Sequence, residues 1–174
     1  MELDAQAKKL QTIIGEMNRL YQALSEVLRN ERVHLLGAAT ERLTESNRSK
    51  ELLLLKLRGL EKERVQSASE LSNILGMGRD NPRLLKIAEK MEAFKHTEWA
   101  RVFRDLHKVL TLHIQHAQEQ NHENEIYAGS ALKVLQGAVQ NIKQTITNKP
   151  TYGKQGQMAG STETQSGNFV RREV

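Results

Sequence analysis

The chain has no cysteine. This absence excludes disulfide bonds, cysteine nucleophiles and thiolate-bound metals, and it is typical of proteins in a reducing compartment. Aromatic residues make up 4% of the 174 residues and there are two prolines, whereas 27% of the residues are charged. Few aromatics and few prolines favour long helices over a sheet-based domain. We therefore expect an all-α protein.

Long hydrophobic runs are also absent. No stretch approaches the roughly 18 apolar residues of a membrane span, and the N-terminal MELDAQAKKL is acidic where a signal peptide is basic. We expect a cytoplasmic protein that does not insert into a membrane. No glycine-rich phosphate loop, nucleophile elbow or paired acids stand out either, so we expect neither an enzyme nor a cofactor.

A net charge of +5 raises nucleic acid as a possible partner. Positive charge is densest over residues 83 to 108, with 7 basic against 4 acidic residues. Acids interleave with these bases, and the segment has no basic groove with stacking aromatics, so a solvated helix face is the simpler interpretation. We expect no nucleic-acid binding, but a nucleic-acid-binding or structural coiled coil stays open as the alternative function.

Apolar residues at three- and four-residue steps predict two long helices, over about 2–36 and 41–75. The short connection between them predicts an antiparallel hairpin, with Gly37 as a left-handed cap of the first helix and Thr40 as the N-cap of the second. Asn47, Lys50 and Arg64 interrupt the apolar face of the second helix. We interpret them as solvent-exposed edges of a two-helix interface.

GMGRDNP, residues 76 to 82, is a strong helix breaker. A short helix is predicted after it, over about 83–94, and then a long third helix over 97–147. Residues 118 to 125 are all polar but include no glycine or proline, so we expect this helix to continue through them. The resulting fold is an elongated α-helical domain of residues 1–147, followed by a flexible tail rich in Gly, Ser, Thr and Gln over 148–174.

Residues 126 to 146 form the most regular amphipathic helix of the sequence. Two adjacent apolar stripes cover roughly 160° of its surface, which is wider than the interface between two coiled-coil helices requires. Periodicity leaves two interpretations open: a core helix with three neighbours, or a face that binds a helix from another protein. The members of the first stripe are Ala128, Leu132, Leu135, Val139, Ile142 and Ile146.

A metal site is the competing chemistry. His113 and His116 lie one turn apart, and Glu119 with His122 forms the Glu-x-x-His step of di-iron helical bundles. Such sites need two of these steps and two further carboxylates, and the ligands expected for zinc are also incomplete. We expect no functional metal site.

Several short motifs in order resemble one known family. Glu31 precedes a Leu-Leu pair at 35 and 36, and Lys50 precedes leucines at 52 to 55, 57 and 60 and then Arg64. Asn121 and Asn124 follow at a spacing of three, then the amphipathic segment, and then Thr151-Tyr152-Gly153 with Gly156. In this order the motifs resemble the FlgN family of flagellar export chaperones over nearly the whole chain.

The resemblance implies a cytoplasmic chaperone that binds the C-terminal helices of the hook-filament junction proteins FlgK and FlgL before secretion. It also implies delivery of these clients to the type III export gate protein FlhA. Binding would then use a partner's amphipathic helix against the apolar face. The residues that we expect to contact the client, with Tyr127 at the rim, are Tyr127, Ala131, Leu132, Leu135, Val139, Ile142 and Ile146.

Overall fold

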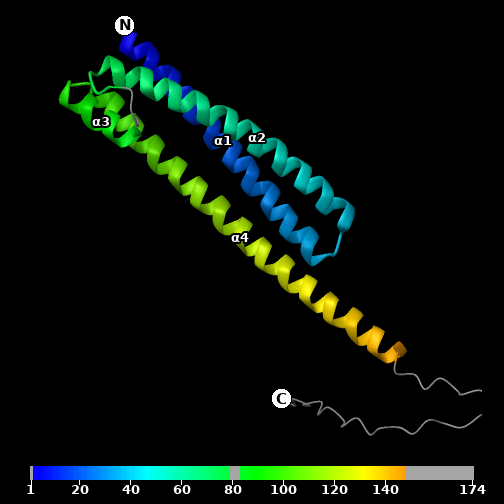
Figure 1. Cartoon of the computed structure of the whole chain (residues 1–174). Coiled ribbons are helices and arrows are strands. Elements are labelled where there is room, and N and C mark those ends of the chain that lie inside the picture. The colour runs from blue at the N-terminus through cyan, green and yellow to red at the C-terminus, as the bar shows by residue number, and fades with distance from the viewer. Residues whose placement is uncertain (1, 79–82, 148–174) are drawn as a thin grey trace, which may run out of the picture. The chain divides into compact units, whose positions relative to one another are not determined.

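The computed structural model describes residues 2–78 and 83–147, and the elements in these ranges are four α-helices (Figure 1). Their bounds are α1 Glu2–Leu36, α2 Thr40–Ile74, α3 Leu84–Ala93 and α4 Thr97–Thr147. The predicted all-α fold is confirmed, and each helix begins and ends within one residue of its expected position. The predicted tail, 148–174, lies outside the described residues.

The chain divides into two units, Met1–Ser130 and Ala131–Val174. In the first unit α1 and α2 lie side by side as an antiparallel hairpin, and residues 97–130 belong to α4 (Figure 1). In the second unit the described part is the helical segment 131–147. Helix α4 continues without interruption through the polar residues 118 to 125, as expected from their composition. The boundary predicted after residue 147 stays a prediction.

A hydrophobic core joins all four helices at the end of the hairpin where α3 lies. Phe103 of α4, Leu71 of α2 and Met91 of α3 are fully buried in it. The ring of Trp99 stacks on Phe103 with 6.0 Å between centroids. The buried members of this core are Ala7, Leu10, Ile14, Ala68, Leu71, Leu75, Leu84, Ile87, Ala88, Met91, Ala100 and Phe103.

A second core runs further along the hairpin and depends on α1. Its buried residues are four from α1, one from α2 and one from α4: Ile13, Met17, Leu24, Leu28, Leu57 and Ala117. Helix α1 contributes most because its apolar positions repeat every three or four residues along most of its length. α1 is therefore the helix on which α2 and α4 both pack.

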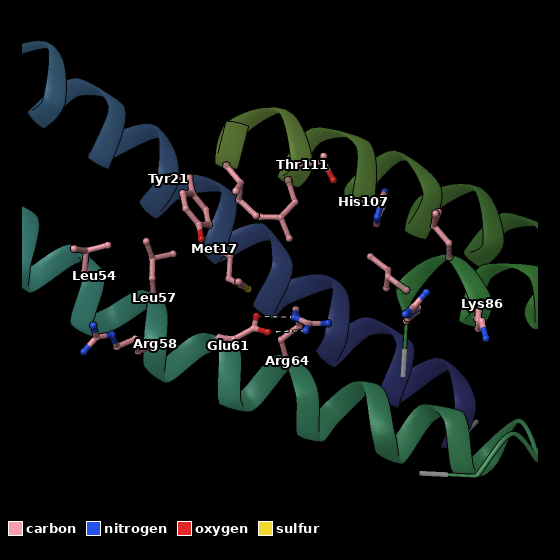
Figure 2. A pocket seen from close by; sticks show the side chains of 15 residues that line it. Met17, Tyr21, Leu54, Leu57, Arg58, Glu61, Arg64, Lys86, His107 and Thr111 are labelled. Atoms are coloured by element: carbon pink, nitrogen blue, oxygen red, sulfur yellow. Dashed lines mark hydrogen bonds and ion pairs between the residues drawn. The ribbon is translucent and has the colours of Figure 1, made fainter. Parts of the chain in front are cut away.

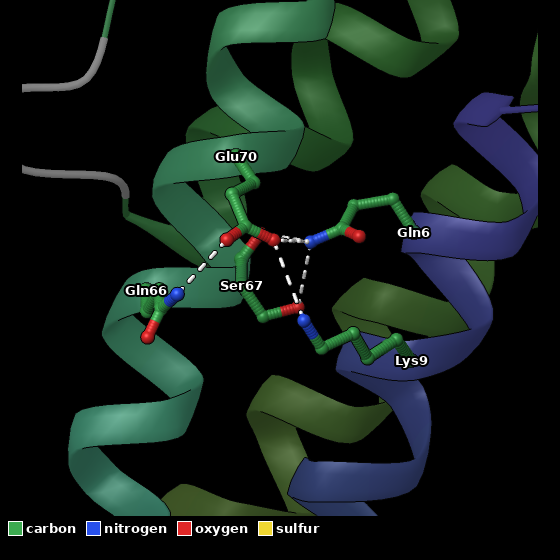
Figure 3. A network of polar contacts seen from close by, with 5 residues as sticks. All are labelled: Gln6, Lys9, Gln66, Ser67 and Glu70. Carbon is green, nitrogen blue, oxygen red and sulfur yellow. Dashed lines mark hydrogen bonds and ion pairs between the residues drawn. The ribbon is translucent and has the colours of Figure 1, made fainter.

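A polar network connects α1 to α2 beside the first core (Figure 3). The amide nitrogen of Gln6 donates to the Ser67 carbonyl oxygen at 3.2 Å and to the Glu70 carboxylate at 2.6 Å. Gln66 donates to the other oxygen of Glu70 at 3.1 Å, and Lys9 lies 3.4 Å from Glu70. The hydrogen bonds from Gln66 and then Gln6 hold the pKa of Glu70 below its usual value. Contacts of this kind fix the register of the hairpin.

Three helices end in the same backbone motif. After α2, Gly76 has a positive φ of 69° and its amide donates to the Asn73 carbonyl at 3.0 Å, and the next amide, of Met77, donates to the Ser72 carbonyl at 2.9 Å. The same pair of reverse hydrogen bonds follows α1 and α3, where the left-handed residues are Ala38 with φ 48° and Lys95 with φ 63°. This is the Schellman arrangement, which satisfies carbonyls of the last helical turn.

Two of the predicted caps are wrong. The helix α1 ends at Leu36 as predicted, but the left-handed residue after it is Ala38 and not Gly37. The N-cap of α2 is Ala39, with no side-chain hydrogen bond, and Thr40 is already helical. Thr40 instead accepts a hydrogen bond through its carbonyl oxygen from the hydroxyl of Thr44 at 3.1 Å.

Candidate functional site

The apolar face of residues 131 to 146 is exposed to solvent. Every residue in this range is exposed, including the small Ala131. A core helix with three neighbours would have buried side chains, and residues 131 to 146 have none. The large apolar side chains and their exposed fractions are Leu132 56%, Val134 72%, Leu135 64%, Val139 51%, Ile142 59% and Ile146 65%.

Part of this face forms a shallow depression of about 620 Å³. Leu132, Leu135 and Val139 line it with Gln136, Gln140 and Lys143. Apolar side chains at successive three- and four-residue steps, flanked by amides, suit the apolar stripe of another helix. The segment 131–147 has lysines at 133 and 143 and no acidic residue.

Tyr127 lies one turn before this segment and is partly buried. The guanidinium carbon of Arg32, in α1, lies 4.7 Å from the centroid of the Tyr127 ring. Arg32 also donates to the backbone carbonyl of Glu123 at 3.1 Å. A cation over an aromatic face stabilises the contact, so Tyr127 has a partner within the protein.

A buried polar cluster joins α1, α2 and α4 close to the turn of the hairpin. The side-chain amide of Asn124 donates to the Leu28 carbonyl at 2.8 Å and to Glu31 at 3.0 Å. Lys50 donates to the other oxygen of Glu31 at 2.6 Å. Glu31 is 7% exposed and Asn124 is 6% exposed. A buried carboxylate needs such partners, and the cluster therefore fixes α4 against the hairpin.

The expectation that Lys50 lies at a solvent-exposed edge is wrong. Its side chain is only 20% exposed, since it forms the ion pair with Glu31. Arg64 is similarly covered, at 21%, and pairs with Glu61 of the same helix at 2.7 Å. Asn47 is exposed, as expected. The polar breaks in the apolar face of α2 thus include an interior ion pair that sequence reasoning missed. The signal for it was the opposite charge of Glu31 on the other helix of the hairpin.

His113 makes polar contacts with α1. Its Nδ1 lies 3.3 Å from the Asn18 side-chain oxygen and its Nε2 lies 3.5 Å from the Gln22 amide nitrogen. Among the described residues, no three His, Cys, Asp or Glu side chains are grouped so that they could hold a metal ion. His113 therefore contributes a polar contact between α4 and α1.

The basic residues of 83 to 108 are partly paired. Arg104 forms an ion pair with Glu92, Arg101 lies 4.0 Å from Asp105, and the ammonium group of Lys90 lies 5.2 Å from the Phe94 ring centroid. The pairing lowers the pKa of Glu92 through the Arg104 hydrogen bond. This is the mixed-charge surface that the interleaved sequence predicts.

None of the described helices combines the length and the apolar character needed to cross a bilayer. No curated protein and no solved structure matches the chain. One family model does match, and it is described as FlgN protein and covers residues 1–160. The match includes the buried Glu31, Lys50 and Asn124 cluster, the exposed apolar face and all four helices. The chain therefore belongs to the FlgN family of flagellar export chaperones.

Proposed function

We propose that this chaperone binds the C-terminal amphipathic helices of the hook-filament junction proteins FlgK and FlgL. In this proposal it holds them in the cytoplasm and delivers them to the export gate protein FlhA. The observation that carries the proposal is the exposed apolar face of residues 131 to 146 in a chain of this family.

The physical basis of the binding is burial of apolar surface. A large aliphatic side chain gains about 1.5 to 3 kcal/mol when it moves fully from water into an apolar contact. Leu132, Leu135, Val139, Ile142 and Ile146 start at least half exposed, so each has much of that gain still available. The sum must first offset the cost of association, about 4 kcal/mol or more. Several anchors together then support micromolar affinity.

Covering the client also explains the chaperone role. An amphipathic helix whose apolar stripe faces water associates with other copies of itself. Occupying that stripe suppresses the association until the client reaches the export machinery. The proposed anchors project from a helix, so the client's helix would lie along them in the helix-in-groove manner.

The test is a matched pair of substitutions. Ile142→Asp places a carboxylate among the proposed anchors and is expected to weaken binding to FlgK and FlgL at least about tenfold, since it removes one apolar contact and adds a charge. Asn141→Asp adds the same charge at the adjacent, non-apolar position and is expected to leave binding nearly unchanged. Calorimetric titration with full-length clients measures both, and truncating the clients' C-terminal helices is expected to abolish the signal.

Circular dichroism separates loss of binding from loss of structure. Both variants are expected to remain as helical as the wild type, because residues 141 and 142 are exposed. Equal affinity of Ile142→Asp and the wild type for the clients would contradict the proposed site. An Ile142→Asp variant that unfolds would instead show that this face contributes to the core.

A further inference from the structure

A groove runs along the first unit between α2 and α4, with α1 as its floor (Figure 2). Its main part has a volume of about 850 Å³, and a smaller part of about 290 Å³ adjoins it toward the turn of the hairpin. Tyr21, Leu54 and Ile114 line both parts, so the two form one depression. The groove exists because α2 and α4 both pack on α1 and leave a space between them.

The bottom of the groove is apolar. Met17 and Tyr21 of α1 and Leu57 of α2 lie together there (Figure 2), and Leu110 of α4 also lines the groove. Leu54 projects from α2 at the side of the groove and is 44% exposed. Burial, followed by the nearby Glu61 carboxylate, raises the pKa of the Tyr21 phenol and so favours its uncharged form. The lining therefore offers an apolar strip to whatever occupies it.

Basic residues line the groove along α2 and at the start of α3. Five basic residues line its two parts, and Glu61 is the only acidic one among the described lining residues. Glu61 is already paired with Arg64, and Lys50 is paired with Glu31. Arg58 and Lys86 form no ion pair with any residue in the described ranges. The basic lining residues are Lys50, Arg58, Arg64, Arg83 and Lys86.

We propose that this groove binds an amphipathic helix of a partner protein whose apolar stripe is flanked by acidic residues. An apolar strip bordered by basic residues of α2 and of the start of α3 complements that chemistry in both shape and charge. The helix would lie between α2 and α4 and complete a four-helix arrangement around the apolar floor.

The dimensions fit a helix of moderate length. The lining residues of α2 extend from Lys50 to Arg64, which is about 14 residues or roughly 21 Å at 1.5 Å per residue. A helix of about four turns covers this distance, with apolar side chains at three- and four-residue steps reaching the floor.

Charge argues against the chain's own segments as occupants. The helical segment 131–147 carries two lysines and no acid, so the same segment of a second copy would repel the basic residues that line the groove. Residues 148–174 carry four basic and two acidic residues and have the same mismatch. An acidic helix from another protein has the matching sign.

This inference goes beyond the proposed function, because the groove and the 131–146 face share no residue. All residues that line the groove lie within Met1–Ser130. The two surfaces can therefore be tested by separate variants of the full chain.

The experiment uses two designed peptides of about 18 residues with identical leucine stripes. One has glutamates beside the stripe and the other has lysines. Fluorescence anisotropy of the labelled peptides against the full chain is expected to show one-to-one binding of the glutamate peptide, at least tenfold tighter than the lysine peptide. The combined variant Arg58→Glu with Lys86→Glu is expected to reverse this preference.

Neighbouring exposed residues provide matched controls. Leu54→Glu is expected to lower the affinity for the glutamate peptide at least tenfold. Leu55 is 66% exposed and lies outside the groove, so Leu55→Glu is expected to leave this affinity unchanged. Lys62→Glu is the control for the loss of a positive charge on α2, because Lys62 does not line the groove, and its affinity for the glutamate peptide is expected to stay unchanged. Ile142→Asp is expected to bind the glutamate peptide as the wild type does, whatever becomes of client binding.

Each contrary result would overturn the inference. Equal binding of the two peptides would show that charge does not select the occupant, and no binding of either would show that the groove accepts no helix. Unchanged affinity in a folded Leu54→Glu variant would place binding elsewhere. If the wild type sediments as a dimer and Leu54→Glu as a monomer, the occupant of the groove is a second copy of the chain. If a single-stranded oligonucleotide displaces the peptide, the occupant is nucleic acid.

Discussion

Lys50 and Glu31 form the ion pair with the least access to water in the described chain, with side chains 20% and 10% exposed. Replacing Lys50 by Met leaves the Glu31 carboxylate buried with Asn124 as its side-chain donor. A hydrogen bond to a charged group contributes about 1.5 to 3 kcal/mol, so we expect Lys50→Met to lower the free energy of unfolding by that amount. Urea denaturation followed by circular dichroism measures it.

Lys9→Met is the matched control at the other end of the hairpin. Lys9 and Glu70 lie 3.4 Å apart, but their side chains are 54% and 40% exposed. Water screens such a pair, and its loss is expected to lower the free energy of unfolding much less than Lys50→Met does. A further variant that changes both Glu31 and Lys50 to Met is expected to recover part of the loss, because it leaves no buried charge unpaired. Equal effects of Lys50→Met and Lys9→Met would contradict the importance of burial.

The apolar positions of the core were predictable at this scale, and the buried charges were not. Leu10, Ile14 and Leu28 of α1 are buried where the three- and four-residue steps placed them. Lys50 interrupts such a pattern in the same way as a solvent-exposed lysine does. Its low exposure depends on its ion pair with Glu31, 19 residues earlier in the chain and on the other helix of the hairpin, and periodicity within one helix carries no information about that partner.

At the scale of the helices, three C-termini share one motif but have different left-handed residues. Only Gly76 is a glycine, and Ala38 and Lys95 adopt the same backbone region with a side chain. Because a Cβ in this region costs about 1 kcal/mol, we expect Lys95→Gly to raise the free energy of unfolding by up to about 1 kcal/mol. Thermal and urea denaturation measure the change.

Lys95→Ala is the control, since it removes the lysine side chain and keeps the strained backbone. Its free energy of unfolding is expected to stay within about 0.5 kcal/mol of the wild type. Gly76→Ala is expected to shift stability in the opposite direction, because φ at this position is 69° and an alanine introduces strain there. A destabilised Lys95→Gly variant would show that the lysine side chain contributes more than the strain costs.

The lengths of the helices followed from the sequence, whereas their caps did not. The cost of a left-handed alanine is small beside the packing of a 35-residue helix such as α1. The helix therefore ends where the hairpin turn requires it, at Leu36, and Ala38 accepts the strain although Gly37 is adjacent. Composition identified the turn, but the choice between neighbouring residues depends on packing that the sequence does not display.

At the scale of the whole molecule, the candidate surfaces differ in how far the sequence predicts them. The amphipathic pattern of residues 126 to 146 was visible in the sequence, although its exposure was not, since a core helix has the same periodicity. The groove was not predictable, because it results from two helices that pack on a third and leave a space between them. Arg58 and Lys86 belong to different helices, and only the fold brings them to one depression.

The division of the chain leads to a prediction about truncation. The side chains of both hydrophobic cores lie between residues 3 and 117, and residues 131 to 146 are exposed throughout. A chain that ends at Ser130 therefore keeps the whole core, and we expect its midpoint of thermal unfolding to stay within about 4 °C of the full chain. The same truncation is expected to abolish binding to FlgK and FlgL, because it removes the proposed anchors.

Phe103→Ala in the full chain shows whether the thermal measurement is sensitive to the core. Phe103 is fully buried, so this variant is expected to lose about 3 to 5 kcal/mol of stability. A truncated chain that unfolds as early as Phe103→Ala would show that residues 131–174 support the fold. A truncated chain that keeps its stability and still binds the clients would place the client-binding site within residues 1–130. The truncation removes the anchors and leaves every core contact in place. A truncated chain that is stable but does not bind the clients would therefore show that the binding segment is separate from the folded unit.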